Sequence, residues 1–176
     1  MVFYVLKLRT RVVALFLLAV ATVAVSVIFL WNRGEEFKEA PLFTVTDLDG
    51  ENFSLEDHRG EIVVIDFMAT WCTYCKPQID ELKLVYEHFK DSPVVIISIS
   101  VDPNDDPDKL AEYRASLGAG WKFAQGSDVG LAYGVKVIPT TVVVDGEGRI
   151  RLQHEGVISS SDLIDKISEL LKELKD

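Results

Sequence analysis

The spacing of hydrophobic and polar positions changes several times along this chain. The first long pattern is a run of twenty residues without a charge, Val12 to Trp31. The next is "LFTVTDLDGENFSL" at 42–55, where apolar residues alternate with polar ones on either side of Asp49-Gly50. Alternation predicts strands with one buried face, and Asp-Gly favours a tight turn, so this segment predicts a β-hairpin.

Two continuous apolar runs follow the hairpin, "EIVVIDF" at 61–67 and "PVVIISISV" at 93–101. Short apolar runs of this kind are typical of strands that are buried on both faces. After the first run, apolar residues recur at intervals of three and four from Thr73 to about Phe89, which predicts a helix. The switch from strand to helix falls at the segment that holds the cysteines.

The C-terminal half shows the same kinds of pattern. "PDKLAEYRASLG" at 107–118 predicts a helix, and "DVGLAYG" at 128–134 predicts a short one. "TTVVVDGEGRIRLQHEG" at 140–156 predicts a hairpin that turns at Asp145-Gly146, and Ser161 to Leu174 predicts an amphipathic helix behind a serine cap. Strands and helices in this order describe a mixed sheet covered by helices, an α/β fold.

The uncharged N-terminal run is long enough to cross a membrane as a helix. Its twenty residues match a hydrocarbon core of roughly 30 Å, so residues 12–31 predict a single transmembrane anchor. Lys7, Arg9 and Arg11 precede the run, and basic flanks stay in the cytoplasm. We therefore expect a cytoplasmic N-terminus at 1–11, a single pass through the cell membrane, and an extracytoplasmic C-terminal domain.

A cleaved signal peptide is the alternative interpretation of this run, since Ala19, Ala21 and Ala24 resemble the small residues of a cleavage site. The apolar residues continue through Ile28 to Leu30, however, beyond the roughly 7 to 15 residues of a signal-peptide core. This length favours an uncleaved signal-anchor.

Charge changes sign beyond the anchor. Residues 32–41 are polar and end in a proline, which predicts a linker to a domain at 42–176. Residues 1–34 hold four of the 18 basic residues and none of the 28 acidic ones, so residues 35–176 carry a net charge of −14. Such a domain repels nucleic acid and anionic lipid head groups, and we expect no nucleic-acid partner.

The segment "DPNDDPD" at 102–108 contributes to this acidity and could be mistaken for a calcium site. It lacks the glycine and the distal glutamate that a calcium loop needs. Its two prolines and the helix that follows describe a loop that leads into a helix.

The only two cysteines are Cys72 and Cys75, within "MATWCTYCKPQ" at 68–78. Cysteines separated by two residues could form a metal clamp, a structural disulfide or a redox pair. A structural zinc site needs four ligands, and the three histidines show no metal-ligand spacing. A disulfide that closes so small a loop contributes little stability, because the entropic benefit grows with loop length. Redox exchange is therefore the favoured interpretation, with no metal and no cofactor.

The position of the pair, between a buried strand and a helix, predicts a role for each cysteine. Cys72 falls where helical N–H groups are unpaired and the macrodipole is positive, which favours its thiolate, so we expect it to be the nucleophile. Cys75 lies one helical turn further on, where it can attack a mixed disulfide at Cys72 and release the partner. We therefore expect Cys75 to be the resolving cysteine.

Two segments, "VVIDFMATWCTYCK" at 63–76 and "YGVKVIPTTVVVDGEGRI" at 133–150, resemble the thioredoxin superfamily. Within it, the chain is similar to the membrane-anchored, extracytoplasmic TlpA/ResA-like thiol-disulfide oxidoreductases, from about Pro41 to the C-terminus. The resemblance implies a thioredoxin-like fold, with a mixed central sheet flanked by helices and an N-terminal β-hairpin. It also implies an enzyme that exchanges thiols and disulfides.

The resemblance makes Pro139 a cis-proline that faces the cysteine pair, and a cis bond is far less costly before proline than elsewhere. The backbone of Ile138 would then pair with an extended substrate segment as an added strand. Trp71, beside the nucleophile, would form a flat apolar shoulder for substrate docking, with packing in the core as an equal alternative.

The remaining candidate site residue is a carboxylate near the cysteines that could accept a proton. The TlpA/ResA-like relatives carry an acid three residues after the second cysteine, where this chain has Gln78. Asp66 instead matches the buried aspartate of ordinary thioredoxins, although Ser98 stands where these proteins pair that aspartate with a lysine. A buried carboxylate with a raised pKa can take the proton of Cys75, so we expect Asp66 to be the proton acceptor.

These features predict a membrane-tethered oxidoreductase that reduces disulfides of extracytoplasmic client proteins. The resemblance implies clients in cytochrome c maturation or oxidase copper-site assembly, and an integral-membrane electron donor that resets the pair. The alternative is copper delivery, as in the SCO-type metallochaperones, whose fold is similar. Those proteins bind copper with two cysteines three residues apart and a histidine in the later hairpin. In this chain the cysteine spacing is two, and Gly146 stands at the position of that histidine. The only histidine nearby is His154.

Overall fold

The structure, a computed structural model, describes residues 20, 22–23, 25–26 and 37–174. The predicted cytoplasmic segment at 1–11 lies outside these residues, and the predicted anchor at 12–31 lies almost wholly outside them. Within the described ranges, no helix is both long enough and apolar enough to cross a membrane. From Phe37 onward the chain forms one compact unit.

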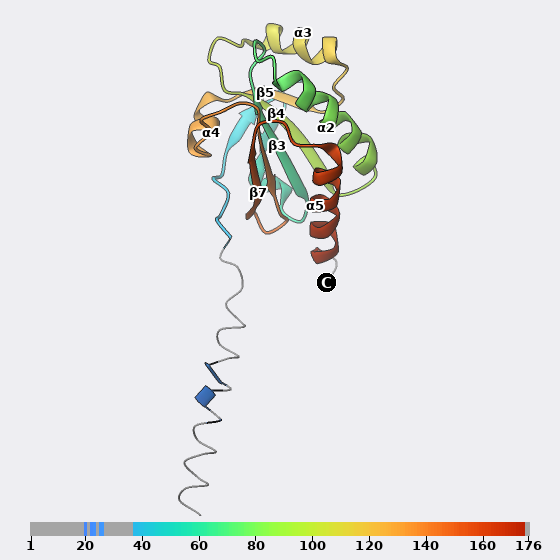
Figure 1. Ribbon diagram of the computed structural model, residues 1–176. Coiled ribbons are helices and arrows are strands. Elements are labelled where there is room, and N and C mark those ends of the chain that lie inside the picture. Colours follow the sequence, from blue (N-terminus) through green and yellow to red (C-terminus); the bar gives the residue numbers. More distant parts are fainter. Residues whose placement is uncertain (1–19, 21, 24, 27–36, 175–176) are drawn as a thin grey trace, which may run out of the picture. The chain divides into compact units, whose positions relative to one another are not determined.

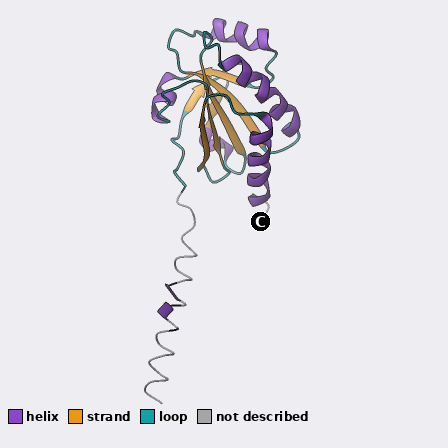
Figure 2. Ribbon diagram, viewed as in Figure 1, coloured by secondary structure: helices purple, strands orange, loops and turns teal. Residues whose placement is uncertain are grey.

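Five strands form the central sheet of this unit, in the order β5-β4-β3-β6-β7 (Figure 2). β3 (Ile62–Met68), β4 (Val94–Ser100) and β5 (Lys122–Gln125) run parallel, whereas β6 (Thr140–Val144) and β7 (Ile150–Glu155) form an antiparallel hairpin beside β3. The mixed sheet that the sequence predicts is thus confirmed. β3 takes the central place because all seven of its residues are buried and most are β-branched, which suits a strand covered on both faces.

The strand β5 is absent from the elements that the sequence predicts. It has four residues, of which only Phe123 and Ala124 are buried, so its pattern is too short to show a period. It pairs with the second half of β4 and extends the sheet by one strand. This pairing carries Trp121, the residue before β5, to a buried position in the hydrophobic core.

Helices cover both faces of the sheet (Figure 1). α2 (Cys75–Phe89), α3 (Pro107–Leu117) and α5 (Ser160–Glu173) contribute to the core on one face, and the short α4 (Ser127–Ala132) contributes to the core on the other. α5 begins at Ser160, one residue before its predicted start, and its serine cap is Ser159, whose side chain accepts a backbone N–H of the first turn.

Alternate residues of β3 enter two separate hydrophobic cores. On one face, Val63, Ile65 and Phe67 pack with residues of α4 and the N-terminal hairpin. Asp66 lies on the opposite face, because successive residues of a strand alternate between the two faces. The core on that face has the following central apolar residues: Ile62, Val64, Met68, Ile79, Leu82, Val85, Leu110, Leu163, Ile167 and Leu170.

The predicted N-terminal hairpin is present as β1 (Thr44–Thr46) and β2 (Asn52–Ser54), which pair antiparallel. Gly50, in the turn between them, has a φ of 83°, a left-handed conformation that glycine adopts at little cost. The inward-facing residues Val45 and Phe53 are buried and belong to the core on the α4 side. The hairpin therefore covers one face of the sheet, where a helix would otherwise be needed.

The segment before this hairpin is attached to the domain, although the sequence assigns residues 32–41 to a linker. The N–H of Ala40 donates to the carbonyl of Gly148 at 2.9 Å, and the N–H of Ile150 donates to the carbonyl of Lys38 at 2.8 Å. A polar segment that ends in proline has the composition of a linker. Its backbone hydrogen bonds to the β6–β7 turn and to the start of β7 show that it is attached to the domain. The described part of this segment thus belongs to the folded unit.

This attachment lies at one particular end of the sheet. The guanidinium of Arg151 lies 4.1 Å from the centroid of the Phe37 ring, a cation–π contact at the start of β7. At the same end of the sheet, Val144 of β6 pairs with Val63 near the beginning of β3. β3 runs from there to Met68, so the chain enters the domain at the end opposite the cysteine-bearing turn.

Candidate active site

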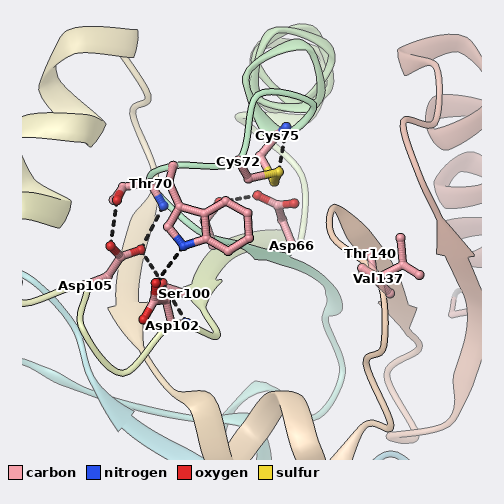
Figure 3. Close-up of a disulfide and its surroundings, with 11 residues drawn as sticks. Asp66, Thr70, Cys72, Cys75, Ser100, Asp102, Asp105, Val137 and Thr140 are labelled. Carbon is pink, nitrogen blue, oxygen red and sulfur yellow. Dashed lines mark hydrogen bonds between the residues drawn. A yellow bond between two sulfur atoms is a disulfide. The ribbon is translucent and has the colours of Figure 1, made fainter.

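The two cysteines form a disulfide at the junction of β3 and α2. β3 ends at Met68 and α2 begins at Cys75, so the intervening segment is a turn that carries Cys72. The sequence pattern starts the helix at Thr73, slightly too early. Cys72 retains 4% of its accessible surface and Cys75 retains none. The disulfide lies at the tip of α2, as Figure 3 shows.

The N-terminus of α2 stabilises negative charge on Cys72. The N–H of Cys75, the first residue of α2, donates to Sγ of Cys72 at 3.1 Å and is shared with the carbonyl of Cys72 at 3.2 Å. In the reduced protein, the same N–H and the helix macrodipole favour the thiolate of Cys72 over its thiol. Cys72 keeps slightly more accessible surface than Cys75, so it is the cysteine nearer to a partner. This geometry fits a nucleophilic Cys72 and a resolving Cys75.

Asp66 lies beneath the disulfide on the central strand, with no accessible surface (Figure 3). Its Oδ2 accepts a hydrogen bond from the hydroxyl of Ser98 at 2.9 Å, and Oδ1 has no hydrogen-bond partner among the described residues. Burial raises the pKa of Asp66 from its ordinary value of 3.8 to about 7, although the hydrogen bond from Ser98 opposes the rise. A carboxyl group with such a pKa can accept and return a proton near neutral pH.

Two polar residues near Asp66 bear on its role. Ser98 leaves the charge of Asp66 without a compensating cation, and Gln78 stands where the TlpA/ResA-like relatives carry a carboxyl group. Ser98 is in register with Asp66 on β4, and a serine brings no positive charge to offset the cost of burial. Gln78 is fully buried on α2, where its Oε1 accepts the N–H of Ile158 at 2.8 Å. An amide does not titrate, so Gln78 ties α2 to the segment before α5 and takes no part in proton transfer.

The loop before β6 contains the cis peptide bond that the resemblance implies, between Ile138 and Pro139. Ile138 packs against the core that includes both cysteines, and Pro139 is buried. The hydroxyl of Thr140 donates to the carbonyl of Val137 at 2.6 Å, which holds the loop against the start of β6. In Figure 3, Val137 and Thr140 lie across from the disulfide, so the loop forms one wall of the site.

Trp71 lies at the surface of the site and not in the core. It is 65% exposed, and its Nε1–H donates to the carboxylate of Asp102 at 2.6 Å, which orients the indole ring. Tyr74, between the cysteines, is 73% exposed. Exposed aromatic rings beside a reactive disulfide offer flat apolar surface to a partner.

Asp105 is a site residue that the sequence does not reveal. It is fully buried, and its carboxylate accepts hydrogen bonds from the N–H and hydroxyl of Thr70, the hydroxyl of Ser100 and the ammonium of Lys109, at 2.6 to 2.8 Å. Burial raises the pKa of Asp105, but these hydrogen bonds outweigh burial and hold it below its ordinary value. The acidic loop at 102–108 therefore anchors the turn that carries Cys72.

The described part of the chain contains no group of three or more His, Cys, Asp or Glu side chains that could hold a metal ion. His154, the histidine closest in sequence to the position that copper delivery would need, lies on β7 in register with Thr141. Gly146 lies in the turn between β6 and β7 and has no side chain to offer.

A disulfide at the start of a helix, a buried carboxyl group and a cis-proline loop suggest a thioredoxin-like enzyme, and residues 37–153 match the AhpC/TSA family. The chain belongs to the AhpC/TSA family. Within this family it resembles the ResA proteins. It is 31% identical over 125 residues to the thiol-disulfide oxidoreductase ResA of Geobacillus kaustophilus, a match that covers 70% of this chain and 71% of the relative.

The ResA protein of Bacillus subtilis is 27% identical over 165 residues, covering 91% of this chain and 90% of the relative. Among solved structures, the thioredoxin domain of a thiol-disulfide oxidoreductase from Bacteroides vulgatus has a TM-score of 0.65 at 25% identity, covering 76% of this chain and 96% of that domain. A thiol:disulfide interchange protein from Chlorobium tepidum has a TM-score of 0.70 at 22% identity, covering 78% and 99%. The AhpC/TSA member described here is thus a thiol-disulfide oxidoreductase with a thioredoxin-like fold, as the sequence predicts.

Proposed function

We propose that this oxidoreductase is tethered to the cell membrane and reduces disulfides of extracytoplasmic client proteins. The observation that carries the proposal is the site itself: Cys72 just before the N-terminus of α2, its Sγ accepting the first helical N–H, a buried Cys75, and Asp66 with a pKa of about 7 beneath them. The ResA relatives support a role in this class of reaction. Clients in cytochrome c maturation or in the assembly of an oxidase copper site are part of the proposal.

The reaction begins with both cysteines reduced. The thiolate of Cys72 attacks one sulfur of a client disulfide, the client S–S bond breaks, and the released client thiolate takes up a proton. A mixed disulfide now joins Cys72 to the client. Cys75 then gives its proton to Asp66 and attacks Sγ of Cys72, which releases the second client thiolate and closes the Cys72–Cys75 disulfide. Two electrons have passed from the enzyme to the client.

The walls of the site give the client a place to dock. The backbone of Ile138, beside the cis bond, pairs with an extended client segment as an added strand. Trp71, Tyr74 and Val137 are all substantially exposed around the disulfide and provide apolar contact. Affinity comes from backbone pairing and apolar area, so the site accepts clients that share an extended segment around a disulfide.

The enzyme must be reduced again after each cycle: an integral-membrane electron donor supplies the two electrons, and Asp66 returns its proton to Cys75. A tether at 12–31 raises the effective concentration of the domain near such a donor and near membrane-bound clients. The N-terminus lies in the cytoplasm and the domain outside, as the basic residues before the run predict.

The equilibrium reduction potential of the full-length protein, measured in detergent against a thiol redox buffer, tests the direction of the reaction. We expect a value near that of thioredoxin, about −270 mV. A value of about −120 to −180 mV would make the protein an oxidant or isomerase and contradict the proposal. In parallel, Cys75→Ser should accumulate mixed disulfides with clients at Cys72, and Cys72→Ser, the matched control, should accumulate none.

A further inference from the structure

The two carboxyl oxygens of Asp66 have different surroundings. Oδ2 accepts the hydroxyl hydrogen of Ser98 at 2.9 Å, whereas Oδ1 is buried without a hydrogen-bond partner in the described part of the chain. A neutral carboxyl group carries its proton on one oxygen at a time. The carboxyl oxygen that holds the proton is therefore the one that can exchange a proton with a neighbouring thiol.

The hydroxyl of Ser98 has a single hydrogen, and a second buried contact determines where it goes. Nε1 of Trp121 lies 2.9 Å from Oγ of Ser98, and an indole N–H can only donate. Ser98 therefore accepts from Trp121 and donates its own hydrogen to Asp66. The three side chains form a hydrogen-bond chain with one direction, from indole to hydroxyl to carboxyl, which we call the Trp121–Ser98–Asp66 chain.

We propose that Trp121 and Ser98 are positioning residues that hold the proton of neutral Asp66 on Oδ1. A proton on Oδ2 would meet the hydrogen that Ser98 already donates to that oxygen, so the other oxygen carries it. The inference rests on the proposed function of Asp66 as the proton acceptor for Cys75. It adds that the acceptor is one specific oxygen, selected by a tryptophan that lies outside the cysteine turn.

The packing around Trp121 holds the indole ring independently of its N–H. The residue is 5% exposed, and its ring lies 5.7 Å from the ring of Tyr86 and 6.0 Å from the ring of Phe123, measured between centroids. Ser98 is fully buried and in register with Asp66, so its oxygen stays beside the carboxyl group whichever way the hydroxyl hydrogen points. The hydrogen bond can therefore be removed while the aromatic packing stays.

Few titratable groups face Asp66 from the neighbouring elements. α2 brings Cys75, which is disulfide-bonded, and α3 brings the buried hydroxyl of Tyr113. β6 brings no titratable group at this level, since its residue in register with Asp66 is Thr141, and β7 brings His154, in register with Thr141. Burial and the hydrogen bond from β4 govern the pKa of Asp66, so its titration reports on the Trp121–Ser98–Asp66 chain.

The test is an NMR titration of the Asp66 side-chain carboxyl carbon in the oxidised full-length protein in detergent micelles, with the signal assigned by its loss in Asp66→Asn. Ser98→Ala should raise the pKa by about one pH unit, since it removes a hydrogen bond to a charged group. Trp121→Phe should shift it in the same direction, because Ser98 can then turn and accept the proton of neutral Asp66. The double variant should match Ser98→Ala alone, because Trp121 acts through Ser98.

Matched variants separate this effect from a loss of packing. Ser98→Thr keeps the hydroxyl and should keep the wild-type titration. Tyr86→Phe removes a hydroxyl from the ring that contacts Trp121, and Ser100→Ala removes a serine hydroxyl on the same strand that bonds Asp105 instead. Neither should move the titration of Asp66. A wild-type titration in Trp121→Phe, or shifts that add in the double variant, would overturn the proposal.

Exchange rates measured against pH distinguish failure of this proposal from failure of the proposed function. If Asp66→Asn exchanges thiols at the wild-type rate at every pH, Asp66 has no role in proton transfer, whereas the NMR shifts still support the Trp121–Ser98–Asp66 chain. If Asp66→Asn loses the pH dependence and Trp121→Phe keeps the wild-type titration, the function stands and the positioning role is refuted.

Discussion

Replacing Asp66 with asparagine should make the oxidised domain more stable at alkaline pH and not at acid pH. Asp66 is fully buried, and its pKa rises from 3.8 to about 7 on folding. A carboxyl group with a raised pKa holds its proton more tightly in the folded state. Its contribution to stability is therefore fully present below pH 3.8 and is lost as the pH rises through about 7.

The size of this loss follows from the same two values. About three pH units separate them, and each unit corresponds to about 1.4 kcal/mol, so the ionised carboxylate costs the folded state about 4 kcal/mol above pH 7. Asparagine has nearly the same shape and stays neutral at every pH. An amide hydrogen left unpaired at this position costs about 1 to 3 kcal/mol, but that cost does not vary with pH.

The assay is urea unfolding of the fragment 37–176, wild type and Asp66→Asn, at intervals from pH 4 to pH 8.5. The disulfide stays oxidised throughout, so that neither cysteine titrates. The difference in free energy of unfolding between the two proteins should change by about 4 kcal/mol in favour of Asp66→Asn across this range. A difference that is the same at pH 4 and pH 8.5 would refute the reasoning, because it would mean that Asp66 ionises near its ordinary pKa.

Two further predictions concern the acidic loop and the N-terminal segment. Asp105→Asn should lower the free energy of unfolding by about 2 to 3 kcal/mol and slow disulfide reduction, because the turn that carries Cys72 loses charge-assisted hydrogen bonds. Asp108→Asn makes the same charge change at an exposed site and should alter stability by less than about 0.5 kcal/mol; equal effects in urea unfolding would contradict the assignment. Full-length protein should sediment with membranes and need detergent for release, whereas a variant that starts at Gly34 should stay in the supernatant; release of the full-length protein by high salt alone would exclude the tether at 12–31.

The parts of the site that depend on local residue patterns could be predicted from the sequence. A continuous apolar run places Asp66 in the interior, and the pairing of Asp66 with Ser98, which the resemblance to thioredoxins implies, is the register that the two parallel strands adopt. The positions of Cys72 and Cys75 relative to the strand and helix follow from the change of period between them. These features are local, or join neighbouring strands, so the sequence specifies them directly.

Two features could not be predicted because they depend on contacts between distant parts of the chain. Asp105 has the same surroundings in the sequence as the other acids of its loop, and its hydrogen bonds from Thr70, 35 residues earlier, are seen only in the folded chain. Trp121 precedes a strand of four residues that shows no period, and its hydrogen bond to Ser98 crosses from that strand to the next. Neither contact leaves a signal in the residues on either side.

The attachment of residues 37–40 to the β6–β7 turn has a consequence for how partners take turns. The disulfide lies at the opposite end of the sheet from this attachment, and there Cys72 keeps 4% of its accessible surface whereas Cys75 keeps none. Under the proposed function, a client and an electron donor both have to reach Cys72, so each would exclude the other from this end of the domain. Turnover would then proceed by alternating visits, in which the donor leaves before the client arrives, and an excess of either partner would slow the cycle by occupying the end of the domain that the other needs.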